Sequence, residues 1–178
     1  MSQATRSNSP TPAQAANRPR RIFPLVVCML LLGGFAATAW LASLHESATT
    51  DEPVSLFSAW ACTQLHDFRC DPENPPLWKY YVGIGMRDDD WKTQLQSPRW
   101  RQMLEDSHAQ GPLASEALYS TPGVDADTLL RGGRARMILL GVVLGAMIGW
   151  WAWRVAGPLA AMVATAFFCL DPNFLAHT

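Results

Sequence analysis

The feature that most constrains this chain is the apolar segment Ile22–Leu44, which contains no Asp, Glu, Lys or Arg. As an α-helix this segment would span about 34 Å, more than the hydrocarbon core of a bilayer, which is about 30 Å thick. A second apolar stretch, Met137–Trp153, and a third, Val155–Leu170, are separated only by Arg154. The sequence therefore predicts that the chain crosses a membrane.

The two later stretches predict a hairpin of membrane helices. A charge at the bilayer centre is costly, so Arg154 belongs at an interface, and the Gly157-Pro158 pair that follows it breaks a helix. The predicted fold is an all-α membrane protein with three transmembrane helices, at residues 22–44, 137–153 and 155–172.

The distribution of charge predicts the orientation. Residues 1–21 contain four arginines and no acid, whereas fourteen of the fifteen acidic residues lie between residues 45 and 131. Basic residues beside the first membrane helix hold its N-terminus in the cytoplasm. Residues 1–21 are thus expected to be a disordered cytoplasmic tail, 45–136 an extracytoplasmic loop, and 173–178 the start of a second outer loop. The expected location is the inner (plasma) membrane.

Two observations leave alternatives open. Arg131, Arg134 and Arg136 lie on the expected outer side and count against this topology, although a loop of this length weakens the charge rule. The Ala37-Thr38-Ala39 sequence is typical of a signal-peptide cleavage site. The first segment continues beyond it and is longer than the apolar part of most signal peptides, which favours an uncleaved anchor.

The outer loop is expected to carry two short amphipathic helices without a large core. Apolar residues recur at helical spacing in two sets, which are Leu56, Phe57, Trp60, Ala61 and Leu65, and then Leu77, Trp78, Tyr81 and Val82. These helices either lie on the membrane surface or pack on each other or on the membrane helices. Trp91 and Trp100 are expected to be isolated anchors and Asp88–Asp90 to be solvated. Cys62 and Cys70 either form a disulfide or stay free.

Asp51 and Glu52 lie a few residues after the first membrane segment, before Pro53. One interpretation is a helix start, because acids and proline are favoured in a first turn and Asp is a good N-cap. The other is chemistry at the membrane surface, where a carboxylate can meet the headgroup of a lipid-linked substrate. Asp125 and Asp127 are expected to cap the segment that leads into the second membrane helix. The four histidines show no ligand spacing for zinc.

Several motifs in a fixed order carry a family resemblance. They are Asp51-Glu52-Pro53, Asp67-Phe68, Asn74-Pro75-Pro76-Leu77, Asp125-Ala126-Asp127 before two leucines, and Leu170-Asp171-Pro172-Asn173-Phe174-Leu175-Ala176-His177. This order resembles the N-terminal part of the integral-membrane glycosyltransferases of the GT-C type. It is most similar to protein O-mannosyltransferases and to bacterial relatives that glycosylate lipid A or surface polymers. The resemblance covers residues 22–178.

The resemblance implies a transferase that moves a sugar from a polyprenyl-phosphate donor to an extracytoplasmic protein, lipid or glycan. It assigns catalytic roles to Asp51 and Glu52, a divalent cation to Asp51, and substrate binding to Asn74 and Arg136. The alternative for Arg136 is ordinary anchoring in the lipid headgroups. Relatives often have His where this chain has Asn74. No nucleic-acid partner is expected.

In the family, a second acidic motif and further membrane helices follow, so this chain is expected to be an N-terminal fragment that is inactive alone. The alternative is a short membrane-anchored interaction protein without catalysis.

Overall fold

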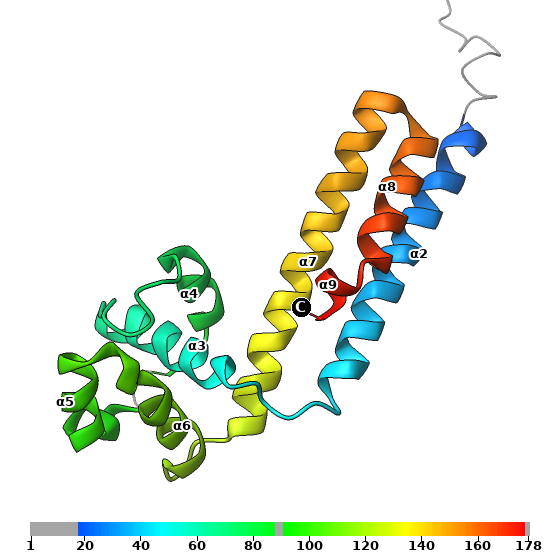
Figure 1. Cartoon of the computed structure of the whole chain (residues 1–178). Helices are drawn as coiled ribbons and strands as arrows, with labels where there is room; N and C mark the ends of the chain where they lie inside the picture. The colour runs from blue at the N-terminus through cyan, green and yellow to red at the C-terminus, as the bar shows by residue number, and fades with distance from the viewer. Residues whose placement is uncertain (1–17, 88–90, 177–178) are drawn as a thin grey trace, which may run out of the picture. The chain divides into compact units, whose positions relative to one another are not determined.

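The computed structural model describes residues 18–87 and 91–176, which are 79% helical and form no strand, as the all-α prediction requires. The expected tail at residues 1–17 and the run Asp88–Asp90 lie outside the described residues, while residues 18–21 already belong to the first helix. The helices are α2 (Arg18–Ser43), α3 (Asp51–Trp60), α4 (Pro76–Gly83), α5 (Pro98–Glu105), α6 (Gln110–Ser120), α7 (Ala126–Ala156), α8 (Pro158–Leu170) and α9 (Pro172–Ala176) (Figure 1).

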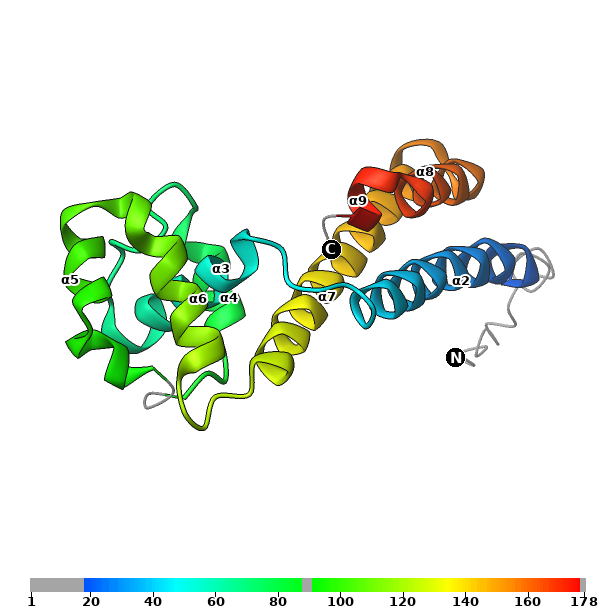
Figure 2. The ribbon, with the colours of Figure 1, turned by 60° about the horizontal axis from the view of Figure 1, so that its bottom comes forward.

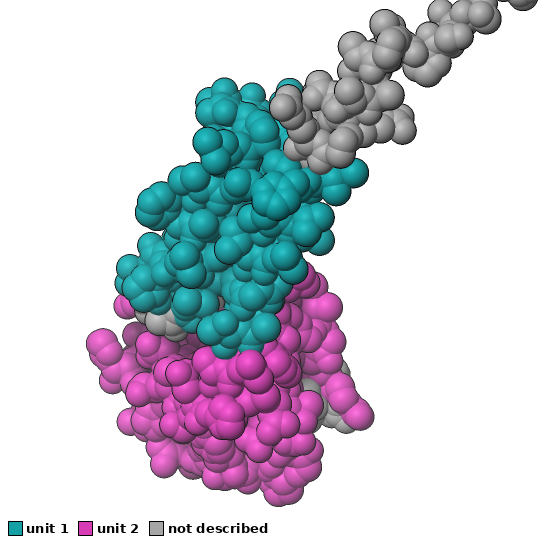
Figure 3. Space-filling model, turned by 90° about the vertical axis from the view of Figure 1, so that its right-hand side faces the viewer, with its two compact units in different colours: residues 1–38, 141–177 teal, residues 39–140, 178 magenta. Residues whose placement is uncertain are grey.

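The chain forms two compact units, which Figure 3 distinguishes by colour. One unit combines the N-terminal helix up to Thr38 with the segment from Gly141 onward, and we call it the membrane unit. The other spans Ala39–Leu140, and we call it the loop unit. Helices α2 and α7 each begin in one unit and end in the other.

Two helices are long and apolar enough to cross a membrane, judged by length and composition, namely Ile22–Ser43 within α2 and Ala126–Ala156. α7 begins at Ala126 and not near Met137 as expected, so Arg131, Arg134 and Arg136 belong to this helix. Asp125 accepts hydrogen bonds from the backbone N–H and the hydroxyl of Thr128, which confirms its predicted capping role. Gly157, with φ of 89°, separates α7 from α8 where the Gly-Pro pair predicted a break.

α8 is shorter than the third membrane helix that the sequence predicted at 155–172. Its 13 residues span about 20 Å, less than the roughly 30 Å of a hydrocarbon core. The expected second outer loop begins with the short helix α9.

Glycines on α7 allow close helix packing in the membrane unit. A Cβ atom at Gly145 would lie 2.7 Å from side-chain atoms of Leu32 and Phe168, and one at Gly149 would lie 2.5 Å from Thr165 Oγ1. Figure 1 shows α8 running beside both α7 and α2, and the rings of Phe35 and Phe168 are 5.4 Å apart. Helices in an apolar solvent associate mainly through packing of this kind, because lipid removes the hydrophobic driving force between them.

We predict that Gly145→Ala destabilises the membrane unit. The added methyl group overlaps the ring of Phe168, and overpacking of this kind costs about 1–3 kcal/mol, against a gain of about 1 kcal/mol in helix propensity. The matched control is Gly34→Ala, because a Cβ there would have no atom within 4 Å. Thermal unfolding of the detergent-solubilised chain should show a lower midpoint for the first variant only. Equal midpoints would contradict the packing argument.

The loop unit has a hydrophobic core, so the expectation that this segment lacks one is wrong. Trp91 and Trp100, expected to be isolated anchors, are buried, and both rings pack on Phe57, with centroids 5.5 and 6.1 Å away. Trp60 is completely buried and stacks edge-on against Trp91. The core was missed because these aromatic residues come from separate short helices and 3-10 turns, whose own sequences show no long apolar period.

α3 is the central helix of this core and packs against α4 and α6 (Figures 1 and 2). The predicted apolar face is confirmed, since Leu56, Phe57 and Trp60 of α3 and Ala61 just after it are buried, and Leu65 packs against the core. Gly83 permits the close approach of α4, because a Cβ atom there would lie 2.9 Å from the carbonyl oxygen of Ala59.

The predicted face of α4 is wrong at one position. Leu77 is exposed, while Lys79, two residues later, is buried in the core.

Candidate functional site

The candidate site is built at the start of α3, in the loop unit. α3 begins at Asp51, and its first turn contains Asp51, Glu52 and Pro53, as expected for a helix start. The backbone N–H of Thr49 donates to Glu52 Oε2 over 2.8 Å, which is one half of a capping box. The Asp51 side chain does not cap the helix. It is exposed, and among the residues that the structure describes none makes a hydrogen bond or ion pair with its carboxylate.

Glu52 is held by an arginine that the sequence did not single out. Arg134 Nε donates to Glu52 Oε1 over 2.7 Å, and Arg134 Nη2 donates to Glu52 Oε2 over 2.9 Å. The two bonds form a fork–fork pair, the geometry in which a guanidinium binds a carboxylate most specifically. The pair is partly shielded, with side-chain exposures of 13% for Arg134 and 28% for Glu52.

Arg134 also binds the backbone that joins α2 to α3. Its Nη1 donates to the carbonyl oxygens of Ser43 and Glu46, and its Nη2 donates to that of Ser47. Ser43 is the last residue of α2, where carbonyl groups lack helical partners and a cation is favoured. One side chain on α7 thus fixes the end of α2 and the start of α3.

The ion pair changes the acidity of Glu52. Partial burial raises the pKa of this carboxyl group, but hydrogen bonds from Arg134 and Thr49 and the positive charge of Arg134 outweigh burial. The pKa of Glu52 therefore lies below its ordinary value of 4.5. A carboxylate with a lowered pKa that is already bound on both oxygens is a poor acceptor for a further proton.

Arg136, predicted to bind substrate, lies two residues after Arg134 on α7 and binds a different element. Its Nη2 donates to the carbonyl oxygen of Ile84, just after α4, and its own carbonyl oxygen accepts a hydrogen bond of 3.0 Å from the hydroxyl of Tyr81. One guanidinium nitrogen is thus occupied by backbone. No described residue forms an ion pair with Arg136.

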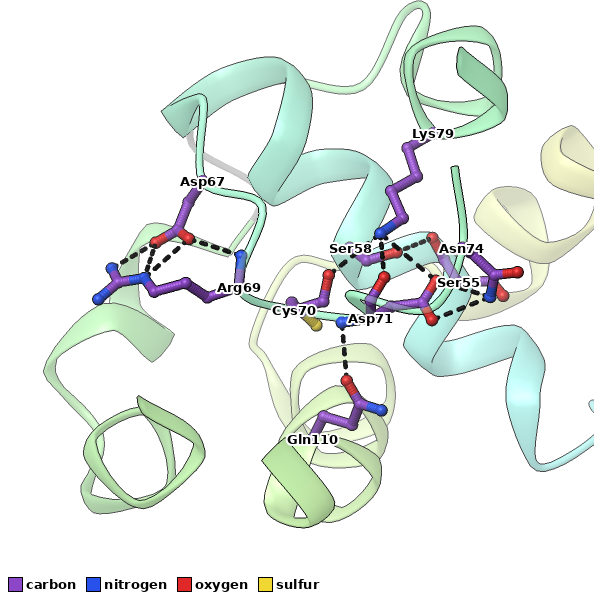
Figure 4. A network of polar contacts seen from close by, with 9 residues as sticks. All are labelled: Ser55, Ser58, Asp67, Arg69, Cys70, Asp71, Asn74, Lys79 and Gln110. Carbon is purple, nitrogen blue, oxygen red and sulfur yellow. Dashed lines mark hydrogen bonds and ion pairs between the residues drawn. The ribbon is translucent and has the colours of Figure 1, made fainter. Parts of the chain in front are cut away.

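Asn74, also predicted to bind substrate, belongs to a separate polar network (Figure 4). Its amide nitrogen donates to both carboxylate oxygens of Asp71, over 2.9 and 3.0 Å. Asp71 lies 3.6 Å from the buried Nζ of Lys79, which also donates to the carbonyl oxygens of Cys70 and Asp71. The backbone N–H of Asp71 donates to Gln110 on α6. Asn74 therefore stabilises the turn that contains Asp71, the acidic partner of Lys79.

The structure brings the predicted residues together only in part. Glu52 is bound by Arg134, whereas Arg136, two positions further along α7, binds Ile84 and Tyr81. Among the described residues no hydrogen bond joins Asn74 or Arg136 to Asp51 or Glu52. No group of three or more His, Cys, Asp or Glu side chains in the described part of the chain could hold a metal ion. The Asp51 carboxylate alone does not make a cation site, and a cation there stays a prediction of the resemblance.

The two cysteines of the loop unit are free thiols and both are buried, so the possible disulfide between Cys62 and Cys70 is not present. Burial, helped by the charge of Asp71, raises the pKa of Cys70 to about 12. A thiol of this kind is unreactive. Both cysteines serve as packing residues.

Comparisons of this chain with protein families, with curated proteins and with solved structures find no match. The roles of the site residues therefore rest on the contacts and charges described above.

The Glu52–Arg134 pair predicts a specific pH dependence of stability. Because the pKa of Glu52 is lowered on folding, the pair stabilises the folded state above pH 4.5, the ordinary pKa, and its contribution is lost as the pH falls through the folded-state value. The difference in unfolding midpoint between the wild type and Glu52→Gln should therefore shrink as the pH is lowered into this range.

Arg134→Gln is the matched variant, because it removes the guanidinium group that lowers the pKa of Glu52 and leaves Glu52 in place. Its pH profile of thermal unfolding should resemble that of Glu52→Gln. If the wild type and both variants lost stability in parallel on acidification, the ion pair would not be the source of the pH dependence.

Proposed function

We propose that this chain is the N-terminal portion of a membrane glycosyltransferase that transfers a sugar from a polyprenyl-phosphate donor to an extracytoplasmic acceptor. The acceptor class is a protein, lipid A or a surface glycan. The observation that carries the proposal is an exposed, unpaired carboxylate, Asp51, beside a carboxylate fixed by an arginine, a few residues beyond an apolar helix. The order of motifs around these residues, which resembles that of GT-C enzymes, supports it.

The proposed topology places α2 and α7 across the inner membrane with the N-terminus in the cytoplasm and the loop unit outside. The apolar segment 155–172, which contains α8, makes the third crossing in this proposal. This topology is supported by the arginines before α2 and by the acidic composition of the loop unit. Asp51 then lies at the outer surface, at the depth where the phosphate of a lipid-linked sugar is presented.

In the proposed reaction Asp51 is the general base. Its carboxylate accepts the proton of the acceptor hydroxyl while the hydroxyl oxygen forms a bond to the anomeric carbon of the sugar. The bond between that carbon and the phosphate oxygen breaks, and the polyprenyl phosphate leaves with the electron pair. A carboxylate within reach of the hydroxyl suits this step, and such assistance contributes about 10²–10⁴-fold to a rate.

Glu52 has a different part in the proposal. Both of its oxygens are bound by Arg134, and its pKa is lowered, so it is suited to positioning and not to proton transfer. By holding the first turn of α3 against α7, Glu52 orients the backbone that carries Asp51. Arg136 has guanidinium nitrogens beyond the one bound to Ile84, and these are proposed to bind the phosphate of the donor. Asn74 offers a substrate only its amide oxygen, because its amide nitrogen donates to the carboxylate of Asp71.

We predict that Asp51→Asn abolishes transfer in the complete gene product. The amide keeps the shape of the side chain but cannot accept the proton, so turnover with a polyprenyl-phosphate sugar should fall about 10²–10⁴-fold. The structural role of Asp51 is small, since its side chain makes no cap, and the folded fraction should not change.

The matched control is Asp106→Asn, which removes a charge from the start of another helical turn of the loop unit, where Asp106 accepts a bond from the backbone of His108. Asn caps a helix about as well as Asp, so this variant should keep its turnover. Near-normal transfer by Asp51→Asn would leave Asp51 as a surface residue of α3 without a catalytic role.

We also predict that Arg136→Ala raises the KM for the lipid-linked donor. Hydrogen bonds to charged groups contribute about 1.5–3 kcal/mol, so the rise should be about 10–100-fold, with partial recovery in Arg136→Lys, which keeps the charge but loses the fork. Arg131→Ala is the control on the same helix, because Arg131 is exposed and lies 3.9 Å from Asp127. An unchanged KM in both Arg136 variants would show that Arg136 does not bind the donor and that its role is the structural contact with Ile84.

A further inference from the structure

The outer surface of α4 is apolar, while the face that it turns into the core carries a charge. Leu77 is 81% exposed and Ile84, which follows α4, is 63% exposed, whereas Lys79 is only 1% exposed. Tyr80 and Phe68 are exposed as well, and their rings are 6.3 Å apart. Val82 is buried and Trp78 and Tyr81 pack against the core, as expected for an amphipathic helix. Leu77 and Lys79 do the opposite of what such a helix does in water, where the leucine would lie inside and the lysine outside.

The inward position of Lys79 is specified by several contacts. Its ammonium group donates to the carbonyl oxygens of Cys70 and Asp71 and lies 3.6 Å from the Asp71 carboxylate. Asp71 is itself held by the amide of Asn74 and by Gln110 (Figure 4). A buried lysine requires such partners, because an unpaired ammonium group in the core would be very unfavourable. The rotation of α4 that exposes Leu77 is therefore fixed by the core.

Exposed apolar residues gathered on one surface indicate contact with another apolar phase or with a partner. We define the α4 outer face as Phe68, Leu77, Tyr80 and Ile84. Leu77 and Tyr80 lie on one side of α4, since they are three positions apart, Ile84 follows directly after the helix, and the ring of Phe68 packs against that of Tyr80. The α4 outer face combines two aromatic side chains with two aliphatic ones, the composition of a helix that lies in a membrane interface.

Contacts between α4 and α7 place this face at the depth where α7 would enter the membrane. Arg136 donates to the carbonyl oxygen of Ile84, and Tyr81 donates to the carbonyl oxygen of Arg136. The uninterrupted apolar run of α7 begins at the next residue, Met137. Both contacts lie within the loop unit, so Ile84 is fixed beside the residue where the polar part of α7 ends.

We propose that the α4 outer face is embedded in the outer boundary of the lipid bilayer, with Leu77, Tyr80 and Ile84 in contact with lipid. The occupant of this surface is the membrane itself. The inference rests on the membrane insertion of α7, which is part of the proposed function. It adds that the loop unit docks on the lipid through α4, which holds the start of α3 at a constant height above the bilayer.

The test is the depth of spin labels in the full chain reconstituted into vesicles of phosphatidylcholine and phosphatidylglycerol. Labels are attached to Leu77→Cys and Ile84→Cys. Wild type treated with the same reagent gives the background, which comes from the partly exposed Cys28, since Cys62, Cys70 and Cys169 are buried. Collisions with oxygen, which concentrates in lipid, are compared with collisions with a water-soluble nickel complex. The control is Leu104→Cys, an exposed leucine on α5, at the end of the loop unit away from α7 (Figures 1 and 2).

The expected result is a severalfold higher ratio of oxygen to nickel collisions at Leu77 and Ile84 than at Leu104. A ratio at either position equal to that at Leu104 would show that the face lies in water and would overturn the proposal. Low collision rates with both reagents would show that another protein surface covers the face, and this too would overturn it.

A label at Leu139, an exposed residue in the apolar run of α7, separates this proposal from the one on which it rests. Oxygen-dominated collisions at Leu139 with nickel-dominated collisions at Leu77 would reject docking by α4 but keep membrane insertion. Nickel-dominated collisions at Leu139 would reject both.

Discussion

The forked ion pair between Glu52 and Arg134 is the contact on which the geometry of the candidate site depends. It joins residues that are 82 positions apart in the chain. Through the same guanidinium, the last carbonyl group of α2 and the segment before α3 are bound to α7. Residues 43–47 are bound to α7 by this one side chain, through three backbone carbonyl oxygens. Asp51 has a defined position because its neighbour in sequence is held in this way.

A partly shielded pair of this kind also limits the chemistry of its members. A guanidinium that makes five hydrogen bonds has no donor left for a substrate, and a carboxylate bound through both oxygens is held in its ionised form. Arg134 and Glu52 are therefore structural partners in the folded chain. The reactive capacity of the Asp-Glu motif is left to Asp51, which shares the first turn of α3 but none of these contacts.

The sequence predicted those parts of the fold that depend on local patterns. The apolar segment after residue 21, the break at Gly157-Pro158, the cap at Asp125 and the buried face of α3 are all signalled within a few residues of where they occur. The sequence predicts too short a helix at α7 because arginines directly before an apolar run are typical of the end of a polar loop. In the structure, however, all three of these arginines have a backbone or carboxylate partner in the loop unit, so a helix can carry them.

The core of the loop unit and the arginine of the site could not be predicted, because both depend on residues distant in sequence. Trp91 and Trp100 are buried through contacts with Phe57, and nothing in their own segments distinguishes them from surface anchors. Arg134 was counted only as a charge against the expected topology. The one local sign was Thr49 three residues before Glu52, a pattern typical of a capping box, which indicates that the Glu side chain turns back toward the helix start.

The positions of Leu77 outside and Lys79 inside on α4 connect the fold to the site. Burying a lysine in the core costs free energy that burying a leucine would not. Removing one partner of a buried ion pair destabilises the fold more than replacing both partners with apolar residues. The chain nevertheless places Lys79 inside and Leu77 outside. This arrangement is favourable if the solvent outside α4 is itself apolar, because Leu77 and Ile84 then leave water as fully as core residues do. In a bilayer interface the loop unit would thus have two apolar environments, its core and the lipid, and α4 would lie between them. Since α4 packs on α3, whose first residue is Asp51, contact with lipid at α4 would set the distance from the membrane to the proposed base.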